Sequence, residues 1–210
     1  MNNSLRFIET IAVYPRFIPL LEQHIFRIKK TALQVGIPDI NDFISLILKD
    51  LEEFSLYIKT GRIYRLSWIY WNKEFIYSWD HRAFPTTNST SLGIHKITYN
   101  LNDKFINLKT NHRENYSEAL KLKPQFQDLL FINQDNIITE SSIAAVFFRK
   151  SNLWFTPCLS TGCVDSTFKH AFAKKHNIIP CRLHYTHLNI MDEIYLGNAI
   201  RGLWRIKVIH

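Results

Sequence analysis

The chain has 210 residues, of which 46% are hydrophobic and 21% are charged, a composition typical of a globular protein with a buried core. This length suits one large domain or two small ones. No stretch of about 18 consecutive apolar residues occurs, and the N-terminus has no basic region followed by an apolar run. We therefore expect a cytoplasmic protein with no membrane partner.

The formal net charge is +8, but the lysines and arginines are scattered along the chain and interleaved with acidic residues. A nucleic-acid-binding protein usually gathers its basic residues into a patch. The pattern therefore favours a protein that handles small anions and predicts no nucleic-acid partner. Cys158, Cys163 and Cys181 lack the CxxC spacing of metal and redox sites, which indicates reduced, buried thiols. His184 and His187 form an HxxH pair with no third ligand close in sequence, so we predict no metal site.

The N-terminal segment predicts a strand followed by a helix. Residues 5–14 have the apolar and β-branched composition of a strand. In the next segment apolar residues recur at helical spacing from Leu21 to Val35. Gly36 and then Pro38 are the expected end of this helix.

A second helix is predicted over 41–60, with Asn41 as its cap. The aromatic-rich segment 62–82 follows and predicts a β-hairpin. Residues 85–92, with the sequence PTTNSTSL, are the best candidate for a linker by composition.

This linker divides the chain into a smaller N-terminal α/β domain, 1–92, and a C-terminal α/β domain, 93–210. The elements expected in the second domain are a strand from Gly93, a helix around 113–121, strands around 144–149 and 153–156, a helix from Ser166 to about His176, a strand-like segment from Ile178, and two final strands. Because helices and strands alternate, we predict the α/β fold class in two lobes.

Two basic residues could carry chemistry. Arg27 lies on the first helix, and its guanidinium offers a fixed fork of donors for a phosphate or a carboxylate. Lys109 lies between an apolar segment and the start of a helix. A lysine shielded from water loses its proton more readily, and a neutral amine is the nucleophile of Schiff-base chemistry. Taken alone, Arg27 is better interpreted as a solvated surface arginine and Lys109 as an ordinary loop lysine.

A third cluster contains Glu140, which opens a nearly uncharged stretch typical of a buried strand. Burying an ionised carboxylate without a partner costs on the order of several kcal/mol or more, so Glu140 must face a partner. Further along, a helix that begins at Ser166 offers unpaired N–H groups and the positive end of its dipole to an anion. Ser166 and Thr167 can add hydroxyl donors. A plain N-cap is the alternative interpretation of this turn.

The order of these motifs resembles the class IV aminotransferase family. The matching stretches are IETIAV, HIFRIKKTA, LKTNHR, ITESSIAAVFFRKSNLWFTPCLSTGC and MDEIYLGNAIRGLW, which cover most of the chain in the right order. The family consists of pyridoxal-phosphate enzymes and includes branched-chain aminotransferase, D-amino acid aminotransferase and aminodeoxychorismate lyase. The resemblance implies a two-lobed fold type IV architecture like that of D-amino acid aminotransferase, a pyridoxal 5'-phosphate cofactor and a homodimer.

The resemblance also implies a role for each matched residue. Lys109 falls where the family attaches its cofactor, and Arg27 falls where a phosphate ligand is expected. Glu140 falls where the family places a carboxylate against the pyridine nitrogen, so its predicted partner is a protonated ring nitrogen. Ser166 and Thr167 fall where backbone N–H groups receive the phosphate.

The chain departs from the family pattern at several positions. It starts eight residues before the pair Glu9-Thr10, where family members have further strands. This predicts that part of the substrate-facing wall is absent or is supplied by a partner subunit. Residues 166–168 replace a GIT-like triplet, Glu114 replaces a frequent tyrosine, and Ala199 replaces a frequent threonine. These changes predict weaker cofactor binding or a different reaction.

Three functions remain open on the sequence. The segment GNAIRGLW, with Asn198 assigned to the cofactor site, resembles the aminodeoxychorismate lyase subgroup, whose members eliminate pyruvate and leave 4-aminobenzoate, a folate precursor. An aminotransferase that moves an amino group between an amino acid and a 2-oxo acid would use the same lysine. The third possible function is that of a non-catalytic family relative that acts as a binding or structural protein. The expected substrate is a small anionic molecule resembling an amino acid, and Arg201 is either a contact for its carboxylate or a surface charge.

Overall fold

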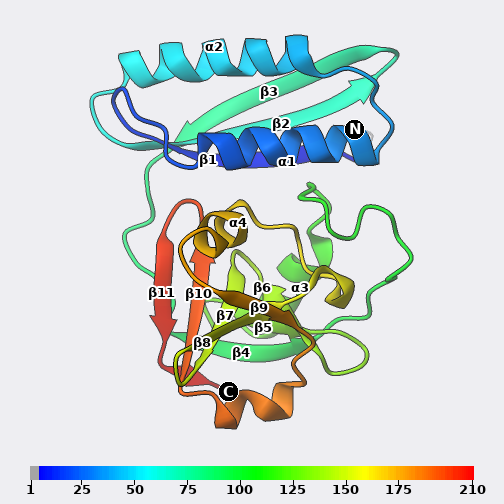
Figure 1. Cartoon of the computed structure of the whole chain (residues 1–210), viewed down its shortest axis with the longest axis vertical. Coiled ribbons are helices and arrows are strands. Elements are labelled where there is room, and N and C mark those ends of the chain that lie inside the picture. Colours follow the sequence, from blue (N-terminus) through cyan, green and yellow to red (C-terminus); the bar gives the residue numbers. More distant parts are fainter. Residues whose placement is uncertain (1–4) are drawn as a thin grey trace. The chain divides into compact units, whose positions relative to one another are not determined.

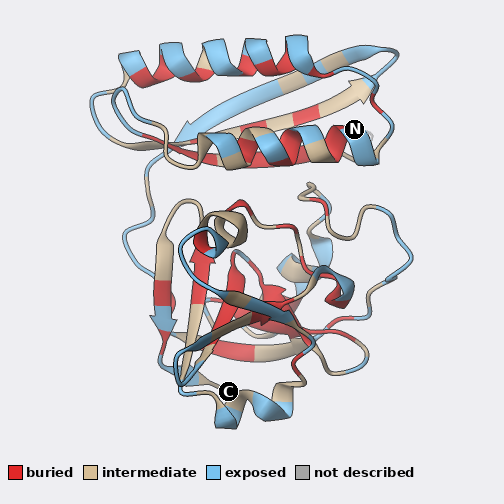
Figure 2. Cartoon of the chain, viewed as in Figure 1, coloured by how far each residue is buried: buried red, intermediate tan, exposed pale blue. Residues whose placement is uncertain are grey.

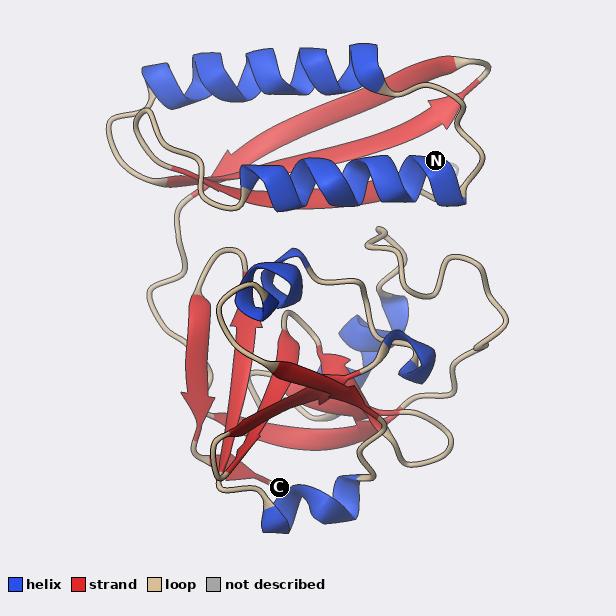
Figure 3. Cartoon of the chain, viewed as in Figure 1, coloured by secondary structure: helices blue, strands red, loops and turns tan. Residues whose placement is uncertain are grey.

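The structure is a computed structural model that describes residues 5–210. Its contacts divide the chain into two compact units. Unit 1 contains the residues up to Thr86 together with Leu108–His112, and unit 2 contains Thr87–Asn107 and Arg113–His210. In both units helices accompany β-sheets, so the predicted α/β class is confirmed (Figures 1 and 3).

Unit 1 is an antiparallel sheet with the strand order β1-β2-β3 and two helices. Its elements are β1 (Phe7–Val13), α1 (Leu21–Gln34), α2 (Asn41–Tyr57), β2 (Arg62–Trp71) and β3 (Glu74–Arg82). The predicted hairpin is confirmed: it turns at Asn72 and Lys73, which both have positive φ, the conformation that a two-residue hairpin turn requires.

Alternate residues of β2 face the helices of unit 1. Tyr64, Leu66 and Trp68 are buried, whereas the residues between them are only half-buried. From α2, Phe43 stacks on Phe75 of β3 with ring centroids 4.4 Å apart. Figure 2 shows the matching pattern on the helices, where buried residues follow one side of α1 and of α2.

Two details of these helices differ from the sequence prediction. The predicted cap Asn41 is the first helical residue, and Ile40 occupies the N-cap position without a side-chain bond. Asp39 instead accepts a hydrogen bond from the Asn41 N–H at 2.9 Å. In α1 the buried face includes the polar residues His24, Arg27 and Thr31 beside the apolar residues Ile28 and Ala32 of the predicted helical spacing.

The segment Leu108–His112 extends the sheet of unit 1. It lies antiparallel to the start of β1: the Ile8 N–H donates to the Lys109 carbonyl at 2.8 Å, and the Asn111 N–H donates to the Arg6 carbonyl at 2.9 Å. Pairing with β1 therefore places Lys109 in unit 1, although the residues on either side of this segment belong to unit 2.

The compact units differ from the predicted division at 92/93 in two respects. Ser91 and Leu92 belong to unit 2, because they begin a strand that pairs with other strands of that unit. The lysine proposed for the C-terminal domain belongs to unit 1 because of its pairing with β1. As a statement about domains that fold separately, the predicted division stays a prediction.

Unit 2 contains two sheets, with the strand orders β11-β10-β7-β8-β9 and β12-β4-β5-β6. Its strands are β4 (Ser91–Lys96), β5 (Leu129–Ile132), β6 (Ile138–Ser141), β7 (Ala145–Lys150), β8 (Leu153–Pro157), β9 (Ile178–Cys181), β10 (Glu193–Asn198), β11 (Gly202–Ile206) and β12 (Val208–Ile209). Its helices are α3 (Glu114–Leu122) and α4 (Thr167–Ala173), with short 3₁₀ turns at Leu159–Thr161 and Tyr185–Ile190.

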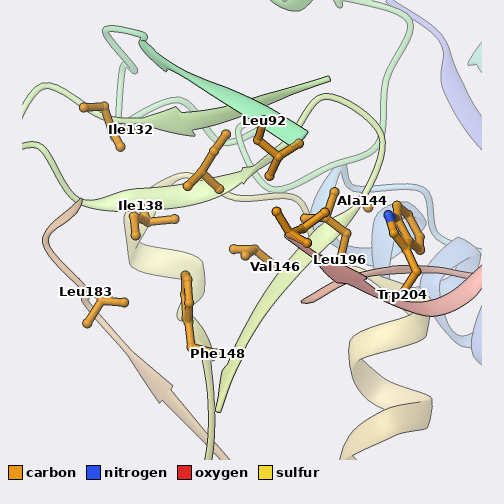
Figure 4. Packing of buried hydrophobic residues seen from close by; sticks show 11 residues of the cluster. Leu92, Ile132, Ile138, Ala144, Val146, Phe148, Leu183, Leu196 and Trp204 are labelled. Atoms are coloured by element: carbon orange, nitrogen blue, oxygen red, sulfur yellow. The ribbon is translucent and has the colours of Figure 1, made fainter. Parts of the chain in front are cut away.

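One apolar cluster joins the two sheets of unit 2. Figure 4 shows side chains from β4, β6, β7, β10 and β11 gathered in this cluster, among them Leu92, Ile138, Val146, Leu196 and Trp204. Because side chains alternate along a strand, the other faces of the central strands are free for the helices. Ala119 of α3 packs with residues of β5, and Phe172 of α4 packs with residues of β7.

Strands β5 and β6 were not predicted as separate elements. Each has four residues, and every one of them is buried, so neither strand shows the alternation of polar and apolar residues that reveals a half-buried strand. Among the helices formed by residues 5–210, none is long and apolar enough to cross a membrane.

Candidate active site

In unit 1 the buried carboxylate of Glu9, on β1, is contacted by two side chains of α1. Arg27 of α1 donates from Nε to Glu9 Oε1 at 2.7 Å and from Nη2 to Oε2 at 2.6 Å. Nδ1 of His24 lies 2.6 Å from the same Oε2. His24 and Arg27 are three residues apart and so lie on one face of α1, which brings both side chains to Glu9.

The charges in this cluster follow from burial and pairing. Burial alone would raise the pKa of Glu9, but the charge of Arg27 and the hydrogen bonds from His24 and Arg27 outweigh it and lower the pKa to about 2. Burial lowers the pKa of His24, and the opposing effect of Glu9 does not overcome this. Neutral His24 therefore keeps its proton on Nδ1 and donates it to the Glu9 carboxylate.

Lys109 contacts the other face of β1. Its Nζ donates to Thr10 Oγ1 at 3.3 Å. Successive side chains of a strand point to opposite faces, so Thr10 and Glu9 lie on opposite faces of β1. The structure thus places Arg27 and Lys109 against neighbouring residues of one strand but on different sides of it. The positive charge of Lys109 is still close enough to contribute to the lowered pKa of His24.

In unit 2 a β-bulge places the predicted acid, Glu140. Leu130 of β5 pairs with Ser141, and Ile132 pairs with Ile138, so two residue steps on β5 oppose three steps on β6. In a regular strand Glu140 would point to the same side as Ile138, which belongs to the apolar cluster. The extra residue of a bulge re-aims the side chains beside it, which lets Glu140 face α3 instead.

Two neutral donors hold the Glu140 carboxylate. Tyr116 of α3 donates its hydroxyl proton to Oε1 at 2.7 Å, and the Val164 N–H donates to Oε2 at 3.1 Å. Burial raises the pKa of Glu140, and these two bonds, together with the charges of Arg113 and Lys169, offset the effect only in part. Glu140 is therefore a buried acid that would gain from a further positive partner.

The turn before α4 lies next to Glu140, since Val164 belongs to it. Ser166 is the N-cap of α4, and its Oγ accepts a hydrogen bond from the Lys169 N–H at 3.4 Å. Thr167 is buried at the first helical position. The plain N-cap interpretation thus describes Ser166 in this structure. The predicted role of both residues in phosphate binding stays a prediction.

Asn198 and Arg201 lie at the turn between β10 and β11. Asn198 Oδ1 accepts from the N–H groups of Ile200 and Arg201 at 3.0 and 2.9 Å, and its Nδ2 donates to the Ile143 carbonyl at 3.1 Å. These bonds give Asn198 a structural role in closing the turn. The Arg201 guanidinium lies 5.6 Å from the centre of the Trp204 ring. Their roles toward cofactor and substrate stay predictions.

The structure therefore brings some of the predicted residues together. Glu140 and the turn before α4 meet within unit 2, and Arg27 and Lys109 both contact β1 within unit 1. The partners Glu9, His24 and Tyr116 received no role from the sequence. The HIFR spacing is the signal that could have revealed His24 beside Arg27, whereas nothing local marks Tyr116 as a partner of Glu140.

The sequence predicted no metal site at the three cysteines or at His184 and His187. Cys163 is buried, and Cys158 and Cys181 are half-buried; all three are free thiols. His184 and His187 have ring centroids 6.2 Å apart. Over residues 5–210 no group of three or more His, Cys, Asp or Glu side chains has an arrangement that could hold a metal ion.

Solved structures share the fold of the chain over nearly its whole length. A provisionally named amino-acid aminotransferase from Mesorhizobium loti has a TM-score of 0.85 and 19% identity, and the match covers 98% of this chain and 100% of that one. A hypothetical aminotransferase from Mycobacterium tuberculosis in its PLP-bound form has a TM-score of 0.84 and 15% identity, over 97% and 81% of the two chains. The 4-amino-4-deoxychorismate lyase from Pseudomonas aeruginosa has a TM-score of 0.82 and 15% identity, over 97% and 83%. These likenesses confirm the fold type IV architecture.

No curated protein matches the chain significantly in sequence. The sequence model of the family described as "Amino-transferase class IV" matches residues 6–209, almost the entire chain. This match agrees with the order of motifs from the first strand to the GNAIRGLW segment. The chain is therefore an enzyme of the class IV aminotransferase family.

Proposed function

We propose that the chain binds pyridoxal phosphate and eliminates pyruvate from aminodeoxychorismate, which leaves 4-aminobenzoate. The observation that carries the cofactor assignment is the state of Glu140. This acid is buried and held by two neutral donors, and burial raises its pKa. A protonated pyridine nitrogen is a cationic N–H donor of the kind that would offset this burial.

The other predicted ligands fit the cofactor to different degrees. Lys109 is half-buried and its amine donates to the Thr10 hydroxyl, and a partly shielded amine is a candidate nucleophile for Schiff-base chemistry. Arg27 supplies positive charge for a phosphate, but its Nε and Nη2 are bonded to Glu9, so a phosphate has to share Arg27 with that carboxylate. Ser166 and Thr167 remain candidates through their N–H groups.

Each residue then has a distinct task. When bound, pyridoxal phosphate supplies a positively charged ring that withdraws electrons from the substrate carbon. Glu140 keeps a proton on the ring nitrogen by offering it a carboxylate oxygen. Lys109 would hold the cofactor, and its Nζ, as a free amine, would accept the proton from the substrate carbon. The positive balance of +8 favours the approach of a dianionic substrate.

The lyase assignment is supported by the GNAIRGLW segment and by likeness to the Pseudomonas aeruginosa lyase. A second candidate is an aminotransferase, which the likeness to the Mesorhizobium loti and Mycobacterium tuberculosis structures favours. Both reactions need the same amine and the same acid. They would differ in outcome: the lyase would release pyruvate from its substrate, whereas the aminotransferase would pass an amino group to a 2-oxo acid.

A spectrum tests the cofactor assignment. The purified protein with added pyridoxal phosphate is expected to show a visible band, which borohydride should bleach while fixing the cofactor to its lysine. Peptide mass analysis should then find the label on Lys109. Lys109→Ala should abolish the band, whereas Lys104→Ala, an exposed lysine of the same loop, should leave it unchanged. A label on Lys169, a lysine of unit 2 whose charge lowers the pKa of Glu140, would overturn the role of Lys109.

Product analysis separates the two reactions. Release of pyruvate and 4-aminobenzoate from aminodeoxychorismate would establish the lyase. Conversion of the bound cofactor to its aminated form by an amino acid, with regeneration by a 2-oxo acid, would establish the aminotransferase instead. We also propose that the chain forms a homodimer and is cytoplasmic. Light scattering tests the homodimer, for which the expected mass is about twice the 24.9 kDa of the chain.

A further inference from the structure

The hydroxyl of Tyr116 fixes one oxygen of Glu140 while the backbone fixes the other. Tyr116 Oη donates to Glu140 Oε1 at 2.7 Å, and the Val164 N–H donates to Oε2 at 3.1 Å. The two donors come from different segments, α3 and the turn before α4. Turning the carboxylate away would leave two largely buried donors without partners, so this arrangement favours a single orientation.

Tyr116 is itself held firmly. Its ring meets the Phe131 ring edge-on, with centroids 4.7 Å apart and an interplanar angle of 88°. On another side the Arg113 guanidinium lies 4.9 Å from the ring centroid, and Arg113 donates a hydrogen bond to the Ser142 carbonyl. The phenol therefore loses little additional freedom when it bonds to Glu140.

A chain of hydroxyl groups behind Tyr116 points toward Glu140. Tyr99 Oη lies 3.3 Å from Tyr116 Oη and 3.4 Å from Thr139 Oγ1. Thr139 donates its proton to the Phe131 carbonyl at 3.1 Å, and Tyr116 donates its own proton to Glu140. Each hydroxyl has one proton, so Tyr99 is the donor in its contact with Tyr116. Tyr99 and Tyr116 thus direct their protons toward the carboxylate, Thr139 directs its proton to the Phe131 carbonyl, and none of the three needs Glu140 as a donor.

We propose that Tyr116 is a positioning residue for Glu140, which it holds as an acceptor aimed at the ring nitrogen of the cofactor, with Tyr99 supporting the phenol from behind. This proposal rests on the proposed function, in which Glu140 contacts that nitrogen. Tyr116 acts through Glu140, and no contact of its own with the cofactor is required.

The remaining charged and titratable groups around Glu140 stay constant in the test. They are Arg113 before α3, Lys169 of α4 and the buried thiol of Cys163. The two cations lower the pKa of Glu140 whether or not the phenol is present. A change that follows removal of one hydroxyl therefore reports the hydrogen bond and not the field of these groups.

The first experiment uses the protein without cofactor. The carboxyl carbon of Glu140 is followed by NMR in protein labelled at glutamate, and its signal is assigned by its loss in Glu140→Gln. Removing the phenol hydroxyl takes away one donor to the ionised form, so Tyr116→Phe should shift the titration midpoint of this signal to higher pH. An unchanged midpoint in a folded Tyr116→Phe protein would overturn the proposal.

Two tyrosines serve as controls. Tyr64 in unit 1 has a buried hydroxyl with no hydrogen-bond partner in the described part of the chain, so Tyr64→Phe should leave the titration of Glu140 unchanged. Tyr99→Phe should shift the midpoint in the same direction as Tyr116→Phe, but by less. This variant also keeps the proposal testable if Tyr116→Phe does not fold. An equal shift in Tyr64→Phe would contradict a specific role for Tyr116.

The second experiment adds pyridoxal phosphate labelled with ¹⁵N in its ring. Tyr116→Phe should bind the cofactor about tenfold more weakly and show a less protonated ring nitrogen. A shifted midpoint with an unchanged nitrogen signal would show that Glu140 does not face the ring, and would overturn this part of the proposal. Failure of the wild-type protein to bind pyridoxal phosphate would instead contradict the proposed function, and the cofactor-free titration would still decide the role of Tyr116.

Discussion

Glu9 in unit 1 and Glu140 in unit 2 are both buried glutamates on strands, yet their surroundings shift them in opposite directions. Glu9 is 3% exposed and Glu140 is 7% exposed. Glu9 meets Arg27 through two charge-assisted bonds, and its pKa falls to about 2. Glu140 meets a phenol and a backbone N–H, and its pKa is raised.

The difference shows that burial alone does not make a carboxylate a ligand site. The charge of Glu9 is already balanced within its own unit, so the simplest role for this residue is to hold α1 against β1. Glu140 keeps its orientation through neutral donors while its charge is only partly compensated. A cationic ligand can therefore improve the surroundings of Glu140 but not those of Glu9.

The largest effect on stability is expected for Glu9→Gln, which tests whether Glu9 has a structural role. Glu9→Gln removes the carboxylate that accepts two charge-assisted bonds from buried Arg27, and we expect a loss of about 3–5 kcal/mol in the free energy of unfolding. Urea denaturation at neutral pH measures this. The matched control is Glu193→Gln, which breaks the more exposed contacts with Arg149 and Arg205 and should cost less than about 1 kcal/mol. A loss no larger than that of the control would contradict the comparison.

A double-mutant cycle measures the interaction energy between Glu9 and Arg27 separately from the effect of each single substitution. Replacing Arg27 by methionine leaves the buried Glu9 carboxylate with neutral His24 but without Arg27, whereas replacing both residues removes both charges. The double variant should therefore be more stable than the sum of the single losses predicts, by about 1–3 kcal/mol. Additive losses would mean that the two side chains do not depend on each other.

The pH dependence of stability should have opposite signs for the two acids. The folded-state pKa of Glu9 is about 2, below its ordinary 4.5, so its contribution is present above pH 4.5 and is lost as the pH falls toward 2, on the order of 3 kcal/mol. The folded-state pKa of Glu140 is raised, so its contribution is present below 4.5 and is lost as the pH rises through that raised pKa. Denaturation of wild type, Glu9→Gln and Glu140→Gln across pH 2–8 would check both signs, and parallel curves would contradict them.

The smallest expected effect concerns Glu140 in the protein without cofactor. Glu140→Gln removes the cost of a buried charge while an amide oxygen still accepts a bond from one donor. We therefore expect a change of about 1 kcal/mol or less in the free energy of unfolding. A loss as large as that of Glu9→Gln would show that Glu140 is structural as well. Cofactor binding, measured on the same variant, should be weakened instead.

Local patterns were sufficient for most of the elements. The hairpin turn at residues 72–73, the helix over Leu21–Gln34 and the α4 start at Ser166 follow from turn residues, helical spacing and a serine cap, each a property of a few neighbouring residues. The two short strands Leu129–Ile132 and Ile138–Ser141 carry no such pattern because both of their faces are covered.

By itself the sequence determined the α/β class, the order of the family motifs and the need for Glu140 to have a partner, since these depend on residue types and spacing. The tertiary structure alone decided which partners are present. The bulge opposite β5 turns Glu140 toward Tyr116, and the pairing of Leu108–His112 with β1 places Lys109 in unit 1. Both depend on contacts between segments distant in the chain, which no local propensity encodes.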